Sequence, residues 1–173
     1  MKFLLILLTF LSCNVEAKEY VFKGRTESKV TFRASGNPGF LRIDGSVGEI
    51  TGSLKDAKEG YQGILEVDLK NAKTGIELRD KHLKEKYLEV DKFPKATLEL
   101  KAVKPSKELF QWTGFLTLKN NTKPVHGTAS LDGDKLKANF SFSLTDYPEV
   151  GIPSWLGVTV AEKVDVSVSA VLE

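Results

Sequence analysis

The sequence predicts an all-β fold of eight or more antiparallel strands, arranged as a sandwich or a closed barrel. Apolar and polar residues alternate with a period of two along several stretches, as they do in strands that bury one face. Turn-forming residues such as Asn120-Asn121 and Asp132-Gly133 separate these stretches. Strands that each carry one apolar face need a sandwich or a barrel to bury those faces. The 173 residues, 41% hydrophobic and 28% charged, fit one globular domain.

Five stretches carry the alternation most clearly. Their apolar members, in chain order, are Val30, Phe32 and Ala34; Leu65, Val67 and Leu69; Leu98, Leu100 and Ala102; Leu136, Ala138, Phe140, Phe142 and Leu144; and Val164, Val166, Val168, Ala170 and Leu172. We expect each set to face the interior, with the intervening polar residues on the outside.

A short helical insert is predicted near residues 75–92. Thr74 and Glu77 have the spacing of a capping box, in which both side chains satisfy backbone donors at a helix start. The helix should end before Pro94, because a proline disfavours the helical conformation in the preceding residue. Four residues spaced by four, three and four fall on one helical face: Ile76, Asp80, Leu83 and Tyr87. A helix between two long strands is suited to close one mouth of a barrel.

The N-terminus has the features of a cleaved signal peptide over residues 1–17. Lys2 supplies the positive charge, Phe3–Leu11 the apolar segment, and the residues around Ala17 a cleavage site, so the mature chain is expected to start at Lys18. The apolar run is about half the roughly 20 residues that a spanning helix needs. Acylation of Cys13, as in a lipoprotein, is the alternative.

Residues 18–173 are expected to form one domain outside the cytoplasm. Cleavage removes Lys2 and Glu16, so the net charge stays at +2, which favours neither nucleic acid nor an acidic surface as a partner. It also removes Cys13, the only cysteine, so neither a disulfide nor a thiolate site is expected. No second apolar run reaches membrane-spanning length, and the sequence leaves the oligomeric state open, a homodimer included.

Two blocks of sequence resemble a known family. The first is Thr74-Gly75-x-x-Leu78-Arg79-Asp80-x-His82-Leu83 followed by Phe93-Pro94, and the second is Gly114-x-Leu116-Thr117-Leu118 followed by Thr122-Lys123-Pro124-Val125. Together they are similar to the YceI family of periplasmic polyisoprenoid-binding proteins, and Asp165 matches its final strand. The stretch Ser28–Phe32 departs from the family because it has no histidine beside it. The resemblance implies an extended, lipocalin-like antiparallel barrel of about eight strands.

The same resemblance implies an isoprenoid-type lipid, an isoprenoid quinone among them, as a ligand held in the barrel of a periplasmic or secreted protein. Small barrels of this kind hold one ligand, and no other cofactor is expected. The candidate cavity-facing residues are Phe32, Leu65, Val67, Leu98, Leu100, Trp112, Leu116, Leu118, Phe140, Phe142 and Leu144. Each also fits a role in ordinary core packing.

Arg79, Asp80 and His82 are the candidates for the barrel rim or for contact with a ligand head group. On a helix these three side chains point in different directions, which disfavours a catalytic cluster. The favoured interpretation is that Arg79 and Asp80 tie the helical segment to the barrel rim by hydrogen bonds and charge pairing. His82 and His126 lack the spacing of a metal site.

The leading hypothesis is therefore a non-enzymatic lipid-binding protein that carries, stores or sequesters its ligand. One alternative is a periplasmic hydrolase or isomerase that uses Asp80 and His82 on a lipid-like substrate. A second is a structural envelope protein whose barrel is filled by its own side chains.

Overall fold

The computed structural model describes residues 19–24, 28–37, 42–57, 60–104, 109–155 and 158–171. The predicted leader, Cys13 and the expected start at Lys18 lie outside these ranges. The strands are β1 (Glu19–Lys23), β2 (Lys29–Asn37), β3 (Arg42–Gly48), β4 (Ile50–Ala57), β5 (Gly60–Asp68), β6 (Lys95–Lys104), β7 (Phe110–Leu118), β8 (Asn121–Asp132), β9 (Lys135–Ser143), β10 (Ser154–Trp155) and β11 (Val158–Val171). The helical segments are η1 (Leu69–Asn71), α1 (Glu77–His82), η2 (Leu83–Leu88) and η3 (Leu144–Asp146).

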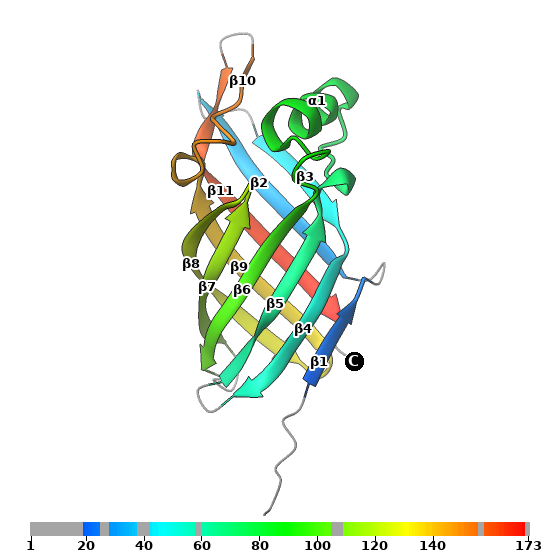
Figure 1. Cartoon of the computed structure of the whole chain (residues 1–173), viewed down its shortest axis with the longest axis vertical. Helices are drawn as coiled ribbons and strands as arrows, with labels where there is room; N and C mark the ends of the chain where they lie inside the picture. The colour runs from blue at the N-terminus through cyan, green and yellow to red at the C-terminus, as the bar shows by residue number, and fades with distance from the viewer. Residues whose placement is uncertain are drawn as a thin grey trace, which may run out of the picture.

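All strands belong to one antiparallel sheet, which confirms the all-β prediction. The order is β1-β4-β5-β6-β7-β8-β9-β11-β2-β3, and β10 pairs with β11. The sheet curls into a half-barrel that is long in the strand direction (Figure 1). We call the end beside α1 the upper end, and the end where the hairpins β4–β5, β6–β7 and β8–β9 turn the lower end.

Ten strands along the sheet, and β10 beside them, exceed the predicted number of about eight. The short strands β1 and β10 add two, and a bend in the chain adds another by separating β3 from β4. Gly48 lies at this bend with a φ of 100°, a conformation that residues with a Cβ rarely adopt. β3 lies at one end of the sheet, where it pairs with β2, and β4 lies near the other end, where it pairs with β1 and β5. The bend at Gly48 therefore allows one continuous run of chain to contribute to both ends of the sheet.

A pair of hydrogen bonds reinforces this seam at the upper end. The amide of Ser46 on β3 donates to the carbonyl of Lys73 at 2.8 Å, and the amide of Lys73 donates back to Ser46 at 2.8 Å. Lys73 follows β5 and η1, so the bonds join the last strand of the sheet to the segment that leads into α1. The curled sheet is therefore held together beside the helical insert.

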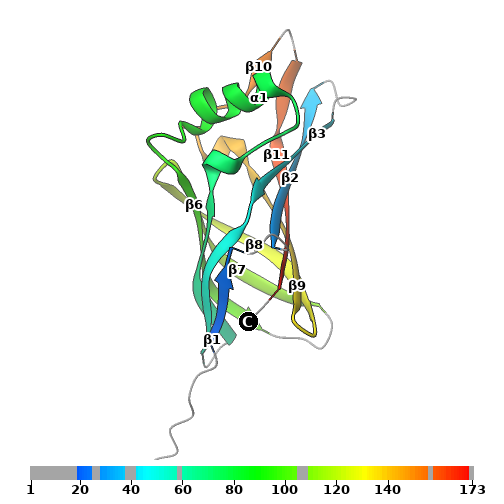
Figure 2. The ribbon, with the colours of Figure 1, turned by 90° about the vertical axis from the view of Figure 1, so that its right-hand side faces the viewer.

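The helical insert lies across the upper end of the barrel, as Figure 2 shows. α1 is followed by η2, a π-helical turn whose partly buried residues Leu83, Tyr87 and Leu88 pack against the core. The insert ends at Glu89 in a left-handed conformation, with a φ of 47°. The predicted helical insert is thus present, although it stops at Leu88 rather than near residue 92.

The predicted capping box is wrong. The residue that precedes α1 is Ile76, and no side chain caps the helix there. The hydroxyl of Thr74 instead donates to the carboxylate of Asp80, six residues further along the chain. The loop is therefore fastened to Asp80 rather than to Glu77, the residue that a capping box would use.

Several side chains are buried at the upper end of the barrel, beneath the insert. Tyr147, in the loop after η3, has no exposed surface and donates its hydroxyl to the carbonyl of Leu116 at 3.0 Å. Leu118, Leu144 and Val150 are buried with it. Lys119, only 8% exposed, pairs with Glu89 at 3.4 Å and donates to the Glu149 carbonyl, so its ammonium group links the insert to the loop after η3.

Candidate functional site

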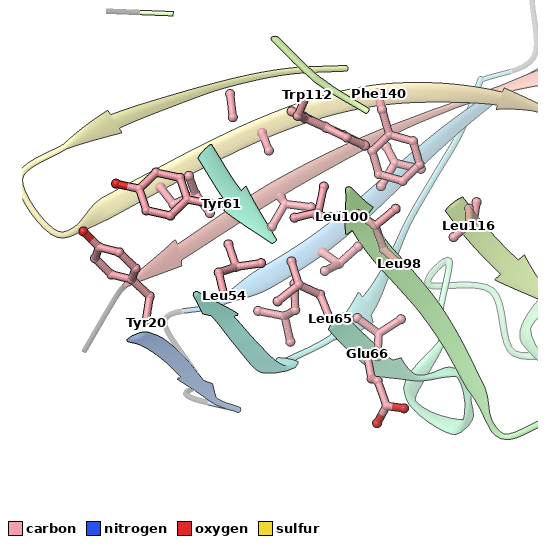
Figure 3. Close-up of a pocket in the computed structure, with 18 of the residues that line it drawn as sticks. Tyr20, Leu54, Tyr61, Leu65, Glu66, Leu98, Leu100, Trp112, Leu116 and Phe140 are labelled. Carbon is pink, nitrogen blue, oxygen red and sulfur yellow. The ribbon is translucent and has the colours of Figure 1, made fainter. Parts of the chain in front are cut away.

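An apolar cavity of about 110 Å³ occupies the barrel below this packed region (Figure 3). Its walls come from β1, β2, β4 to β9 and β11, so nearly the whole sheet contributes to it. The lining residues are Tyr20, Val30, Ile50, Leu54, Tyr61, Leu65, Glu66, Val67, Ala96, Leu98, Leu100, Phe110, Trp112, Leu116, Ala129, Leu131, Leu136, Ala138, Phe140, Val166 and Val168.

Strand register aligns these side chains into belts around the cavity. Leu65 on β5 pairs with Leu98 on β6, which pairs with Leu116 on β7. On the opposite wall, Phe140 of β9 pairs with Val166 of β11. Because alternate residues of a strand face the same side, each belt turns aliphatic or aromatic surface inward and leaves polar residues outside.

The cavity reaches the surface at the lower end. Leu131, near the end of β8, lines the cavity and is also 37% exposed. Tyr20 and Tyr61 form the rim on the β1 side, where their rings meet edge to face with centroids 5.3 Å apart. Both hydroxyls lie at one end of the cavity in Figure 3, away from Leu116. The two ends of the barrel thus differ, one closed by packing and one leading to an apolar interior.

The cavity wall has little polar character. The carboxylate of Glu66 points away from the other labelled side chains in Figure 3 and pairs with the ammonium group of Lys95 at 2.7 Å. Trp112 Nε1 is a buried nitrogen with no hydrogen-bond partner among the described residues, and the Trp112 ring packs edge to face on Phe140 with centroids 5.3 Å apart. Such a wall favours a hydrocarbon chain and disfavours a charged group, whose desolvation would be uncompensated.

Arg79 and Asp80 form a separate network at the upper end. Asp80 accepts hydrogen bonds from the amide of Thr74, at 2.6 Å, and from its hydroxyl. Arg79 donates from Nε to the Thr74 hydroxyl oxygen at 2.7 Å and from Nη2 to the Thr74 carbonyl at 3.0 Å. Burial alone would raise the pKa of Asp80, but the bonds from Thr74 hold this pKa below its ordinary value. The three residues form a clamp next to the Ser46–Lys73 seam.

His82 takes no part in this clamp, and its side chain is exposed. Within the described residues, no three histidine, cysteine, aspartate or glutamate side chains gather closely enough to hold a metal ion. The same part of the chain contains no helix that is long and apolar enough to cross a bilayer.

A comparison with protein families matches residues 20–172 to the YceI-like domain. The chain belongs to this family. A comparison with curated proteins found no match for the YceI-like chain.

Solved structures share its fold. Burkholderia cenocepacia BcnA matches with a TM-score of 0.66 and 18% identity, over 84% of this chain and 94% of the other. A polyisoprenoid-binding domain from Saccharophagus degradans, implicated in plant cell wall breakdown, matches with a TM-score of 0.66 and 14% identity, over 91% and 99%. A Campylobacter jejuni YceI protein matches with a TM-score of 0.61 and 16% identity, over 76% and 84%.

In this YceI-like chain, seven of the eleven candidate cavity residues line the cavity: Leu65, Val67, Leu98, Leu100, Trp112, Leu116 and Phe140. Phe32, Leu118, Phe142 and Leu144 do not. Leu118 and Leu144 are buried in the packed region around Tyr147, and Phe142 meets the Tyr147 ring edge to face at 5.4 Å. The ring of Phe32 packs against the backbone of Gly45 on β3.

Sequence reasoning missed the rim residues Tyr20, Tyr61, Phe110 and Leu131. Phe110 could have been predicted from the sequence, because it continues the alternation of Trp112 and Leu116 toward the N-terminus. Tyr20 and Tyr61 stand on β1 and at the start of β5, where too few apolar neighbours alternate to reveal a strand. Arg79 and Asp80, the rim or head-group candidates, lie at the end of the barrel away from this opening.

Proposed function

We propose that this YceI-like protein binds the hydrocarbon chain of a polyisoprenoid or similar amphiphilic lipid, and that it carries, stores or sequesters this lipid without catalysing a reaction. The observation that carries the proposal is an apolar cavity closed at one end and open at the other. The polyisoprenoid-binding domain from Saccharophagus degradans, which shares the fold, supports the same class of ligand.

The orientation of the ligand follows from the polarity of the wall. Each methylene group that leaves water for the cavity contributes about 0.8 kcal/mol. A charged or strongly hydrated head group gains nothing there, so it stays at the lower rim beside the Tyr20 and Tyr61 hydroxyls. The tail enters first and stops below the packed layer under Tyr147.

The size of the cavity favours a second candidate, a structural protein with a filled barrel. A volume of about 110 Å³ is small beside the roughly 300–1,000 Å³ of typical ligand cavities. A long chain therefore requires the lining side chains to change rotamer and the β1 side of the rim to move outward. Tyr20 and Phe110 are only partly buried, so their side chains have room to change rotamer.

Native mass spectrometry of the purified protein, before and after organic extraction, tests the proposal. We expect an extractable prenyl lipid, or uptake of an isoprenoid quinone by the extracted protein with one chain bound per barrel. A protein that carries no lipid and takes up none would support the structural candidate.

Ala138→Leu tests the location of the ligand. Ala138 lines the cavity, so a larger side chain occupies the space that the tail needs, and we expect prenyl-chain affinity to fall at least about tenfold. Thr113→Leu is the matched control, because Thr113 is exposed on the outer face of β7. Thermal unfolding of both variants reports whether the fold is kept. Equal loss of affinity in the two variants would place the ligand elsewhere.

The hydrolase or isomerase alternative rests on Asp80 and His82, which lie at the closed end of the barrel. The carboxylate of Asp80 already accepts a hydrogen bond from the Thr74 amide, and the side chain of His82 is exposed on the helix. We expect His82→Ala to bind prenyl lipid as the wild type does, and we expect neither protein to convert the bound lipid to a product. Turnover of a bound lipid that is lost in this variant would establish the enzyme.

We also propose that the protein works in the periplasm or is secreted, as the leader sequence supports. Expression in a Gram-negative host should yield periplasmic protein whose intact mass corresponds to a start at Lys18. A mass that includes an acyl chain on Cys13 would establish a lipoprotein instead.

A further inference from the structure

We propose that the lower rim of the barrel docks on a phospholipid bilayer and places the cavity mouth against the membrane. The inference rests on the proposed function for its purpose, because a prenyl chain is too insoluble to cross water between membrane and cavity. Its structural support is independent and lies in the side chains of the rim.

The lip formed by β7 and β8 exposes leucine on both of its faces. Leu109, directly before β7, is 59% exposed, and Leu131, near the end of β8, is 37% exposed. Phe110 pairs with Ala129, so the two leucines are near neighbours across the two strands. Leu131 and Phe110 face the cavity, so Leu109 points to the outside of the barrel. A lip that is apolar on both faces suits hydrocarbon better than water.

Exposed lysines continue from this lip around the lower end, on the adjacent strand β9 and, two strands further along the sheet, on β2. Lys137 of β9 and Lys29 of β2 both pair with Ser169 of β11, so they share one row of the outer face near the lower end. Lys135 begins β9 at the hairpin tip, and all three lysines are exposed. Asp132 and Asp134 in the same hairpin offset part of this charge. Insertion of the leucines is therefore the main attraction, and anionic lipids add to it.

The rim is continuous with the cavity, which distinguishes it from the other exposed apolar side chains. Ile76 and Leu78 are 54% and 52% exposed, but they lie at the start of α1, above the packed region. A membrane that contacted them would meet the closed end of the barrel. At the lower end, Leu131 belongs to both the rim and the cavity wall, so a chain could pass from bilayer to cavity without contact with water.

Sedimentation with vesicles that contain no prenyl lipid tests the docking surface. The probes are pure phosphatidylcholine vesicles and vesicles with added phosphatidylglycerol, and the protein is the full chain as a host exports it. We expect binding to both, and stronger binding to the anionic vesicles. Leu109→Ser and Leu131→Ser should each weaken binding about tenfold, since each removes one inserted leucine.

Leu78→Ser is the matched control, because Leu78 is a leucine of similar exposure at the opposite end. It should bind vesicles as the wild type does. The proposal would be overturned if the wild type bound neither kind of vesicle. It would also be overturned if Leu78→Ser weakened binding as much as Leu109→Ser and Leu131→Ser do. Binding to anionic vesicles alone that is unaffected by Leu109→Ser would overturn the proposal too, since that result indicates adsorption by charge.

The Ala138→Leu variant separates this proposal from the proposed function. Its cavity is filled but its rim is intact, so it should dock normally while it fails to take up a prenyl chain. A wild-type protein that takes up prenyl lipid from detergent micelles yet does not sediment with vesicles would overturn docking and leave lipid binding in place.

Discussion

Tyr147 belongs to the packed upper end of the barrel, where Leu118, Leu144 and Val150 are also buried. The ring is fully buried, its edge meets Phe142, and its hydroxyl donates to the Leu116 carbonyl. Burial first, and the nearby carboxylate of Asp146 second, raise the pKa of this phenol well above its ordinary value of 10.0. The protonated form is therefore the one that the folded state holds.

Tyr147→Phe should lower the free energy of unfolding by about 1 kcal/mol at pH 8, since it removes one buried hydrogen bond. Above pH 10 the unfolded wild-type chain ionises this phenol while the folded chain does not. Ionisation then stabilises the unfolded wild type, so its stability falls as pH rises, and the difference from Tyr147→Phe should shrink by about 1 kcal/mol near pH 11. Urea titrations at the two pH values measure this. An unchanged difference would show that Tyr147 titrates normally.

The clamp at Thr74 shows how far a local motif can be interpreted from sequence. Thr74 and Glu77 have capping-box spacing, but Asp80 offers a second carboxylate within reach of the same donors. Which carboxylate binds depends on where α1 begins, and the Ser46–Lys73 bonds fix the path of the chain just before it. This tertiary constraint has no trace in residues 74–80 themselves. The chemistry of Arg79 and Asp80 predicts hydrogen bonds that tie the insert to the barrel rim. The observed bonds run instead to Thr74, in the loop that leads into α1.

At the scale of elements, period-two alternation located the long strands because each buries one face over many residues. The alternation over Leu136–Leu144 corresponds to β9, and the one from Val164 onward to β11. The number of strands could not be predicted in the same way, since Gly48 splits a continuous run into β3 and β4. Gly48 ends one strand, rather than lying within a longer one, only because the strands on either side of it pair with different neighbours in the sheet.

Gly48→Ala should therefore destabilise the protein by about 1–3 kcal/mol, because alanine strains a φ of 100° and its methyl group would lie 3.2 Å from the Cβ of Asn71. Gly133→Ala is the control. Gly133 has a φ of 61° in the β8–β9 turn and open space around it, so its cost should be about 1 kcal/mol. Urea denaturation of both variants provides the comparison. Equal losses would mean that the corner at Gly48 relaxes readily.

At the scale of the whole molecule, the barrel has a packed upper end and a hollow lower end. Alternation predicts which residues face inward, but it does not give their height along the barrel axis, which strand register and the insert determine. Leu116 and Leu118 are two residues apart on one face of β7, yet the first lines the cavity and the second lies in the packed region. The sequence therefore predicted the inner surface and left open how much of it encloses space.

Hydrogen exchange should reveal this asymmetry when a prenyl ligand binds. β1 pairs only with β4 among the described strands, so its amides should exchange early in the free protein. A tail that packs beside Tyr20 should slow exchange in β1 and in the lower parts of β4 and β5, and leave α1 and η2 unchanged. Mass spectrometry of wild type and Ala138→Leu, each with and without an isoprenoid quinone, measures it, and Ala138→Leu should show no slowing. Slowing confined to residues 77–88 would instead locate the ligand at the upper end, beside Arg79, Asp80 and His82.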